Sequence, residues 1–110
     1  EIETLFDRKD YAGIIKYYEE ESINNTLHPY SLLKVGSAYF YTNNYKEAIN
    51  AFDTFIALNT IDSSRGYWYK LLVYLKQKNK TKVNEMLKLI LSNKANYNYK
   101  KALEIKNDIE

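Results

Sequence analysis

Few side chains in this sequence could do acid–base or metal chemistry, and they lie apart. His28 is the single histidine, and it stands beside Pro29 in a polar connection. A general base needs an orienting partner, and no carboxylate or hydroxyl group has a useful spacing to His28. Glu19, Glu20 and Glu21 are consecutive, so in a helix they point in different directions and do not converge on a cation. The sequence therefore predicts neither a catalytic centre nor a metal site.

The motifs of several other chemistries are missing from the sequence. The chain has no cysteine, which excludes disulfides, thiolate metal sites and thiol catalysis. It also has no glycine-rich phosphate loop. We therefore expect a protein that is not an enzyme, holds no cofactor and acts on no small-molecule substrate.

The net charge of +2 is distributed unevenly. Residues 1–30 hold seven acidic and three basic side chains, a balance of −4, and residues 70–110 hold ten lysines against four acids, a balance of +6. A basic end can attract nucleic acid or an anionic surface. Binding to such a partner is one function that the sequence permits. The lysines alternate with Leu, Ile and Asn, and this favours the simpler interpretation that they lie on solvated helix faces. We therefore do not expect nucleic acid to be the main partner.

A chain of 110 residues suffices for one domain with one core. No apolar run reaches the roughly 18–20 residues of a membrane span, and no signal peptide is present. The sequence begins at Glu1 rather than at Met, which is compatible with the removal of a signal or an anchor. The compartment stays open between cytoplasm and periplasm.

Apolar residues recur at intervals of three and four, the period of amphipathic helices. Three glycines and one proline leave few points at which a helix would break. The predicted helices cover 11–22, 29–42, 45–58, a stretch from about Tyr67 to Lys78, 80–92 and 96–109. Short polar connections predict that neighbouring helices form antiparallel hairpins. We expect an all-α fold.

The helical pattern repeats along the chain. Three positions recur 34 residues later (45 minus 11): Tyr11 as Tyr45, Ile14 as Ala48 and Tyr18 as Phe52. Three others recur 35 residues later (67 minus 32): Leu32 as Tyr67, Gly36 as Leu71 and Tyr39 as Tyr74. Ala48 and Phe52 recur in the same way as Val83 and Leu87. The repeating unit is a pair of helices.

The unit at 29–62 resembles a tetratricopeptide repeat, whose large, small, Tyr, Ala and Phe positions are Leu32, Gly36, Tyr39, Ala48 and Phe52 here. The resemblance covers about residues 1–95. The stretch from Trp68 to Leu75, the turn after it and the capping helix look most like the terminal repeats of bacterial members. It implies a right-handed α-solenoid of antiparallel helix pairs, and a single domain over 1–110. The implied units are a partial first repeat at 1–28, a second at 29–62, a third at 63–95 and a capping helix at 96–110. The third unit departs from the family pattern, with Leu71 at the small position and Val83 at the alanine position.

The resemblance also implies a function, because the first helix of each family repeat lines a concave surface that holds a partner's peptide or helix. The matching residues of the second unit are Tyr30, Leu33, Ser37, Phe40 and Tyr41. Those of the third unit are Arg65, Trp68, Tyr69, Leu72 and Lys76. Leu33, Ser37 and Phe40 replace the Lys and Asn with which some members grip a terminal carboxylate. We therefore expect a protein-binding scaffold with an apolar, aromatic groove, in which Phe40, Leu72 and Trp68 are either contacts or core.

The two ends of the stack carry further predictions. The helix at 96–109 should cap the stack by burying Leu103 and Ile105. Ile2, Leu5 and Phe6 should form an exposed apolar edge, because no complete helix pairs with them. Such an edge predicts either a chain that continues upstream or self-association with another chain.

Overall fold

Seven α-helices and short turns make up the described part of the chain, residues 1–21, 27–59 and 61–110 of a computed structural model. The helices are α1 (Ile2–Asp7), α2 (Tyr11–Glu21), α3 (Ser31–Tyr41), α4 (Tyr45–Leu58), α5 (Ser63–Lys76), α6 (Lys80–Leu91) and α7 (Tyr99–Ile109). No strand occurs among these residues. The predicted all-α class is confirmed.

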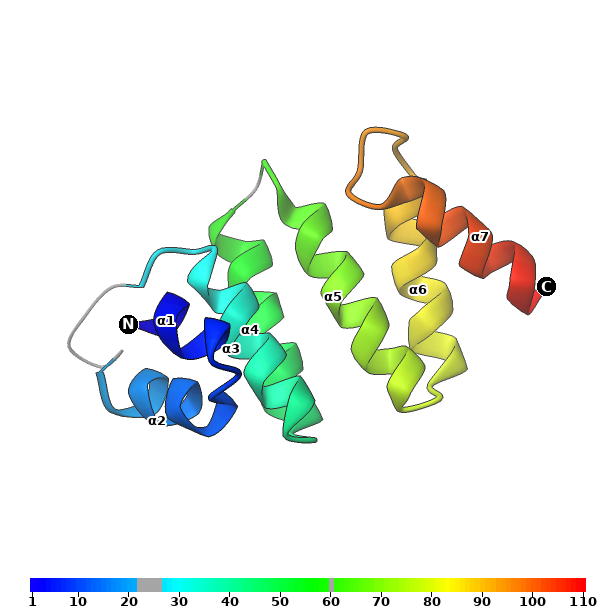
Figure 1. Cartoon of the computed structure of the whole chain (residues 1–110). Helices are drawn as coiled ribbons and strands as arrows, with labels where there is room; N and C mark the ends of the chain where they lie inside the picture. Colours follow the sequence, from blue (N-terminus) through cyan, green and yellow to red (C-terminus); the bar gives the residue numbers. More distant parts are fainter. Residues whose placement is uncertain (22–26, 60) are drawn as a thin grey trace.

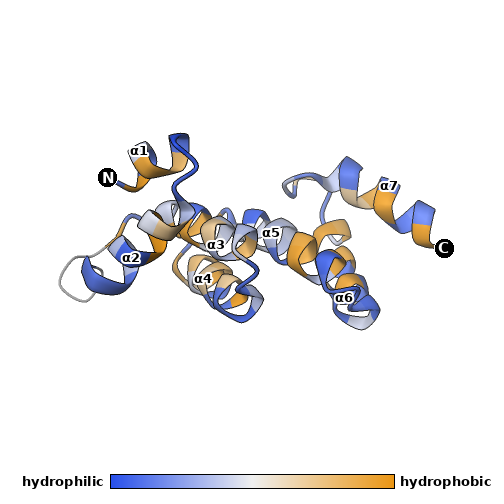
Figure 2. Cartoon of the chain, turned by 60° about the horizontal axis from the view of Figure 1, so that its bottom comes forward, coloured by the Kyte–Doolittle hydropathy of each residue, from blue (hydrophilic) through white to orange (hydrophobic). Residues whose placement is uncertain are grey.

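The helices follow one another across the molecule in chain order (Figure 1), and each packs against its neighbour in sequence. Helices α3 to α6 run alternately down and up in that view. Figure 2 shows α1 and α7 on the same side of the row formed by α2 to α6. The radius of gyration is 14.3 Å, whereas a globular domain of this length would have about 13 Å. The molecule is therefore somewhat elongated, with extents of 43, 27 and 22 Å.

The turns inside the three successive helix pairs share one backbone geometry. Lys9, Asn43 and Lys78 all have left-handed backbones, with φ of 57°, 65° and 57°. The residue after each donates its N–H to the carbonyl five positions earlier: Asp10 to Leu5, Asn44 to Tyr39 and Asn79 to Tyr74, at 2.9, 2.8 and 3.0 Å. Such bonds satisfy carbonyls at the end of a helix and fix the chain reversal. The same reversal thus occurs at positions 9, 43 and 78.

The core forms two clusters of buried side chains. The N-terminal cluster is built around α1 to α4, and Phe52 and Phe55 are its largest fully buried members. The C-terminal cluster joins α5, α6 and α7 and centres on Leu71 and Ile90, both fully buried. Val73 of α5 belongs to the N-terminal cluster, so α5 contributes to both. Burial of these apolar faces supplies most of the driving force for folding.

Gly36 marks the place where α4 comes closest to α3. A Cβ atom added at Gly36 would overlap the ring of Phe52, so this mid-helix glycine is needed for a close helix contact. A second close approach was not predicted: a Cβ at Gly66 would overlap Ile56 where α5 meets α4. Gly13 has a different neighbour, because its N–H binds the Asp10 carboxylate at 2.9 Å, an N-terminal cap of α2.

Several predicted boundaries differ from the structure. Helix α3 begins at Ser31 instead of residue 29, because Pro29 and the residues beside it form tighter i to i+3 bonds, such as Leu32 N–H to Pro29 O at 3.0 Å. Helix α7 begins at Tyr99 instead of residue 96, because Asn98 has a left-handed φ of 55°. Helix α2 ends at Glu21 in the structure, and the predicted last residue, 22, lies outside the described residues.

Two predictions about exposure, one at each end of the molecule, differ from the structure. Ile2 is buried, and Leu5 and Phe6 pack against the N-terminal cluster, because α1 folds onto α3. The predicted exposed edge is therefore wrong. Self-association, which was inferred from that edge, stays a prediction without this support. In α7 the prediction for Ile105 is confirmed, but Leu103 is 39% exposed and Ala102 is the fully buried residue.

A hydrogen bond between α2 and α3 has a consequence for alkaline stability. The hydroxyl of Tyr39 donates to the Glu19 carboxylate at 3.0 Å. Burial raises the pKa of Tyr39 most, and the hydrogen bond and negative charge of Glu19 raise it further. The pKa of a tyrosine in the unfolded chain is about 10. The folded state therefore keeps a proton that the unfolded state loses above about pH 10.

We expect the free energy of unfolding to fall as pH rises above about 10, by up to about 1.4 kcal/mol per pH unit for Tyr39 alone. Tyr39→Phe removes this titration, so the decline should be less steep in urea unfolding followed by circular dichroism from pH 9 to 11. Tyr17→Phe, which removes a hydroxyl without a hydrogen bond in the described residues, should keep the wild-type slope. Equal slopes for both variants would contradict the assignment to Tyr39.

Candidate protein-interaction face

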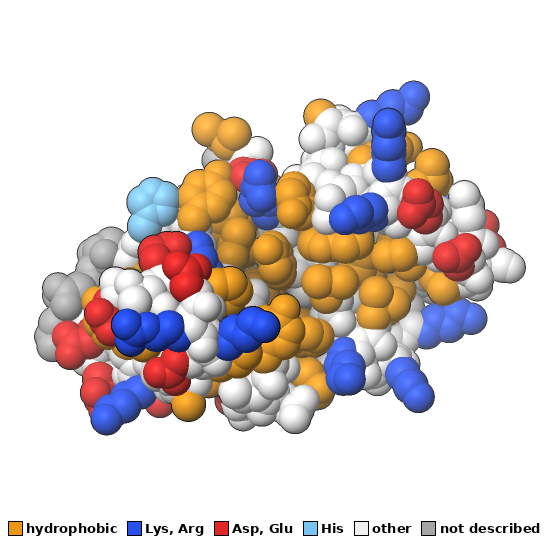
Figure 3. Space-filling model, viewed as in Figure 1, with side chains coloured by type: hydrophobic (Ala, Val, Ile, Leu, Met, Phe, Trp, Pro, Cys, Tyr) orange, Lys and Arg blue, Asp and Glu red, His pale blue; other side chains and the backbone are white. Residues whose placement is uncertain are grey.

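A small hollow lies between α3 and α5, at the place where the groove was predicted. Its volume is about 30 Å³, and its lining residues are Ser37, Phe40, Tyr41, Phe52, Tyr69 and Leu72. Five of the predicted residues meet there, one of them Leu72, and Phe52 reaches in from α4. We call Phe40, Tyr41, Tyr69 and Leu72 the aromatic face. Hydrophobic side chains form a broad area on this side of the molecule (Figure 3).

Ring contacts hold the members of the aromatic face in place. The ring of Tyr41 lies 4.8 Å from that of Tyr11 and 5.5 Å from that of Phe40, yet Tyr41 remains 56% exposed. Tyr69 lies 5.3 Å from Phe52, and its burial raises the pKa of its hydroxyl. The face therefore offers rigid, uncharged rings with hydroxyl groups at their edges, which suits contact with an apolar segment.

Two predicted contact residues of α3 are turned away from solvent. Leu33 belongs to the N-terminal cluster, and Ser37 is 8% exposed. The Ser37 hydroxyl donates to the Leu33 carbonyl at 2.7 Å, inside its own helix. The reason is that α3 packs against α1, α2, α4 and α5, which leaves it little free surface. Leu33 is thus a core residue, and Ser37 reaches only the bottom of the hollow.

Tyr30 and Arg65 do not line the hollow. Both bind the carboxylate of Asp62 instead. Asp62 accepts a hydrogen bond from the Tyr30 hydroxyl at 2.9 Å and one from Arg65 Nε at 2.6 Å. The guanidinium of Arg65 also lies 4.3 Å from the centre of the Tyr97 ring. The Tyr97 N–H in turn donates to the Ser64 hydroxyl at 3.0 Å. This network connects the starts of α3 and α5 with the loop before α7.

The last two predicted contact residues also lie outside the hollow. Trp68 is half-buried and packs against the C-terminal cluster, so it contributes to the core. Lys76 is exposed in the last turn of α5 and does not line the hollow. The structure therefore divides the predicted set into a face, a charged network, core residues and the exposed Lys76.

The side chains considered for catalysis have ordinary structural partners. His28 is exposed, and its Nδ1 accepts the Tyr30 N–H at 3.3 Å while the two rings stack. Within the described ranges, no group of three or more His, Cys, Asp or Glu residues could hold a metal ion. Over the same ranges, no helix combines the length and the apolar character needed to cross a bilayer.

The lysines of residues 70–110 do not form one uniform basic surface. Lys70 is 14% exposed and pairs with Asp53 at 2.7 Å, between α5 and α4. Lys82 pairs with Glu85 at 3.2 Å within α6. The remaining lysines of this stretch are exposed, as predicted for solvated helix faces.

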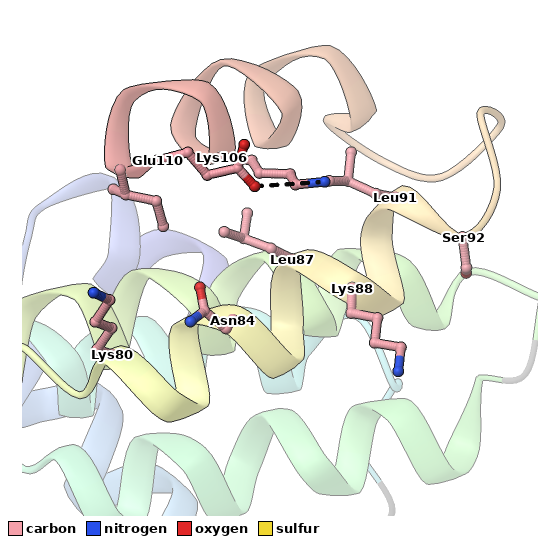
Figure 4. Close-up of a pocket in the computed structure, with 9 residues that line it drawn as sticks. Lys80, Asn84, Leu87, Lys88, Leu91, Ser92, Lys106 and Glu110 are labelled. Carbon is pink, nitrogen blue, oxygen red and sulfur yellow. Dashed lines mark ion pairs between the residues drawn. The ribbon is translucent and has the colours of Figure 1, made fainter.

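A larger concavity that sequence reasoning missed lies between α6 and α7. It measures about 680 Å³, and its lining residues are Lys80, Asn84, Leu87, Lys88, Leu91, Ser92, Lys106, Ile109 and Glu110. We call it the lysine-rimmed groove, and Figure 4 shows Leu87 pointing into it from α6. The only sequence signal for it was Ile109, an apolar residue at the end of a mostly polar helix, which is 40% exposed.

Comparison with known proteins supplies no relative from which a function could be transferred. The chain matches no family model, no curated protein and no solved structure.

Proposed function

We propose that this protein is a scaffold of tetratricopeptide-like helix pairs, stacked as a right-handed solenoid, that binds a segment of another protein. The identical turns at Lys9, Asn43 and Lys78 support the stacked architecture, because their spacing equals that of the repeating sequence pattern. The order of the helix contacts also agrees with it, since α1, α3 and α5 pack side by side while consecutive helices pair. Stacked pairs of this kind leave extended surfaces on which partners can lie.

The observation that carries the proposal is the aromatic face itself. Phe40, Tyr41, Tyr69 and Leu72 come from two helices and surround one hollow, and none of them carries a charge. Exposed apolar areas bordered by polar residues mark interaction sites more often than chance, and tyrosine is a frequent anchor in them. The hollow is too small for a drug-sized ligand, which needs about 300 Å³ or more. A helix or extended segment of a partner, with one or two apolar side chains at the hollow, fits it better.

A selection from a library of helical and extended peptides tests this proposal. Peptides enriched on the wild-type protein should carry aromatic or aliphatic anchors, and in NMR titrations they should shift the amide signals around Tyr41 and Leu72. The double variant Tyr41→Glu/Leu72→Glu places charge on the face, and we expect it to weaken their binding at least about tenfold. Trp68 is unsuitable for this purpose, because its truncation would remove packing from the C-terminal cluster.

The matched control is Leu58→Glu/Ile61→Glu, which adds the same charge at apolar residues that are 60% and 98% exposed and lie outside the hollow. This control should change peptide affinity less than about twofold. The proposal would be wrong if both double variants weakened binding equally. It would also be wrong if no peptide were enriched, or if the shifted signals lay on other helices.

A further inference from the structure

The lysine-rimmed groove combines an apolar floor with a basic border. Leu87, Leu91 and Ile109 supply the floor, and Ile109 also borders a second hollow of about 250 Å³ that continues past Val83 to Leu75. Leu87 is 3% exposed and lies at the bottom, whereas Leu91 is half-buried and Ile109 is 40% exposed, so the open apolar surface comes mainly from Leu91 and Ile109. The fold places it beside α7, whose buried contribution to the cluster is the small residue Ala102.

Three lysines border the groove, and only one of them has a partner. Lys106 lies 3.8 Å from Glu110, whereas Lys80 and Lys88 make no ion pair within the described part of the chain. The nine lining residues therefore hold three positive charges and one negative charge, a balance of +2. An occupant that complements this border must bring negative charge beside an apolar surface.

The shape of the groove selects among acidic occupants. It extends along α6 from Lys80, its first residue, to Ser92, just past its end (Figure 4). The 12 residues of α6 span about 18 Å, the length of a helix of about three turns. Single-stranded nucleic acid would need aromatic rings on which its bases stack, and none of the nine lining residues is aromatic.

We propose that the lysine-rimmed groove binds an acidic amphipathic helix of another protein. The apolar stripe of that helix lies over Leu87, Leu91 and Ile109, and its flanking carboxylates reach Lys80, Lys88 and Lys106. This is a helix-in-groove interaction with complementary charge. It is independent of the aromatic face, from which it differs in helices, charge and size.

The test uses a synthetic peptide of about 14 residues, about 21 Å long as a helix, with leucine along one face and glutamate elsewhere. Fluorescence anisotropy should show binding of this peptide, with affinity at least about tenfold above that of a scrambled peptide and of one with lysine in place of glutamate. In NMR titrations the shifted amides should lie on α6 and α7. No measurable binding, or equal binding of the scrambled peptide, would overturn the proposal.

Charge reversal locates the site. Lys88→Glu/Lys106→Glu should weaken binding at least about tenfold, whereas Lys100→Glu/Lys101→Glu, the same change on exposed lysines outside the groove, should weaken it less than about threefold. If both double variants lost the same affinity, net charge alone would explain the binding and the proposal would be overturned. An oligonucleotide that displaced the labelled peptide as well as the unlabelled peptide does would overturn it too. Tyr41→Glu/Leu72→Glu should leave this peptide's affinity unchanged, so failure here is distinguishable from failure of the aromatic face.

Discussion

Phe52→Ala is expected to lower the free energy of unfolding by about 3–5 kcal/mol, the largest loss from any single substitution considered for this chain. Phe52 is 1% exposed and reaches from α4 between α3 and α5. Its ring lies against Gly36 and Tyr69. Truncation removes these contacts and leaves a cavity that rigid helix backbones cannot fill. Domains of this size are stable by about 5–15 kcal/mol, so the variant should lose a large share of the stability of the fold.

Urea unfolding followed by circular dichroism measures this loss. Phe40→Ala is the matched control, because it truncates the same residue type at the half-buried border of the same hollow. Its ring has solvent on one side, and we expect a loss of about 1–2 kcal/mol. A smaller loss at position 52 than at position 40 would show that the Phe52 ring does not carry the packing between α3, α4 and α5.

Gly36→Ala is expected to destabilise the fold by about 1–2 kcal/mol, although alanine is the better helix former. The new methyl group would overlap the Phe52 ring, and overpacking of this kind costs about 1–3 kcal/mol. The gain in helix propensity returns about 1 kcal/mol at most. Gly13→Ala receives the same gain, and its methyl group meets the end of the Asp10 side chain, which can rotate away. We expect a change below about 1 kcal/mol there, because the disturbed cap offsets the gain.

A double-mutant cycle with Phe52→Leu tests the cause of the Gly36→Ala effect. Leucine is smaller than the Phe52 ring, so Gly36→Ala should cost at least about 0.5 kcal/mol less in the Phe52→Leu background. Additive losses in the cycle would contradict the overlap between Gly36 and Phe52. A stabilised Gly36→Ala variant would contradict it as well.

The sequence alone was sufficient for the class of the fold and for its local features. Apolar residues at three- and four-residue intervals predict amphipathic helices because side chains on one helix face must be buried together. The short polar connections between the predicted helices marked the turns that the structure has at Lys9, Asn43 and Lys78. These features depend on residues that are near each other in the chain. Boundaries at Pro29 and Asn98 were missed by two or three residues, because several turn geometries compete there.

Only the tertiary structure decided which side chains remain free. Leu33 and Ser37 share the helical pattern of Tyr41, but α3 has four neighbouring helices, and their packing leaves Tyr41 exposed while it covers the other two. Arg65 pairs with Asp62 in the first turn of its own helix, but its contact with Tyr97 depends on where the loop before α7 lies. The lysine-rimmed groove exists because α7 folds back over α6 and brings Lys106 and Ile109 opposite Leu87. Helix periodicity predicts which face of a helix is buried. Which side chains of other helices lie against that face depends on how helices distant in the sequence pack together.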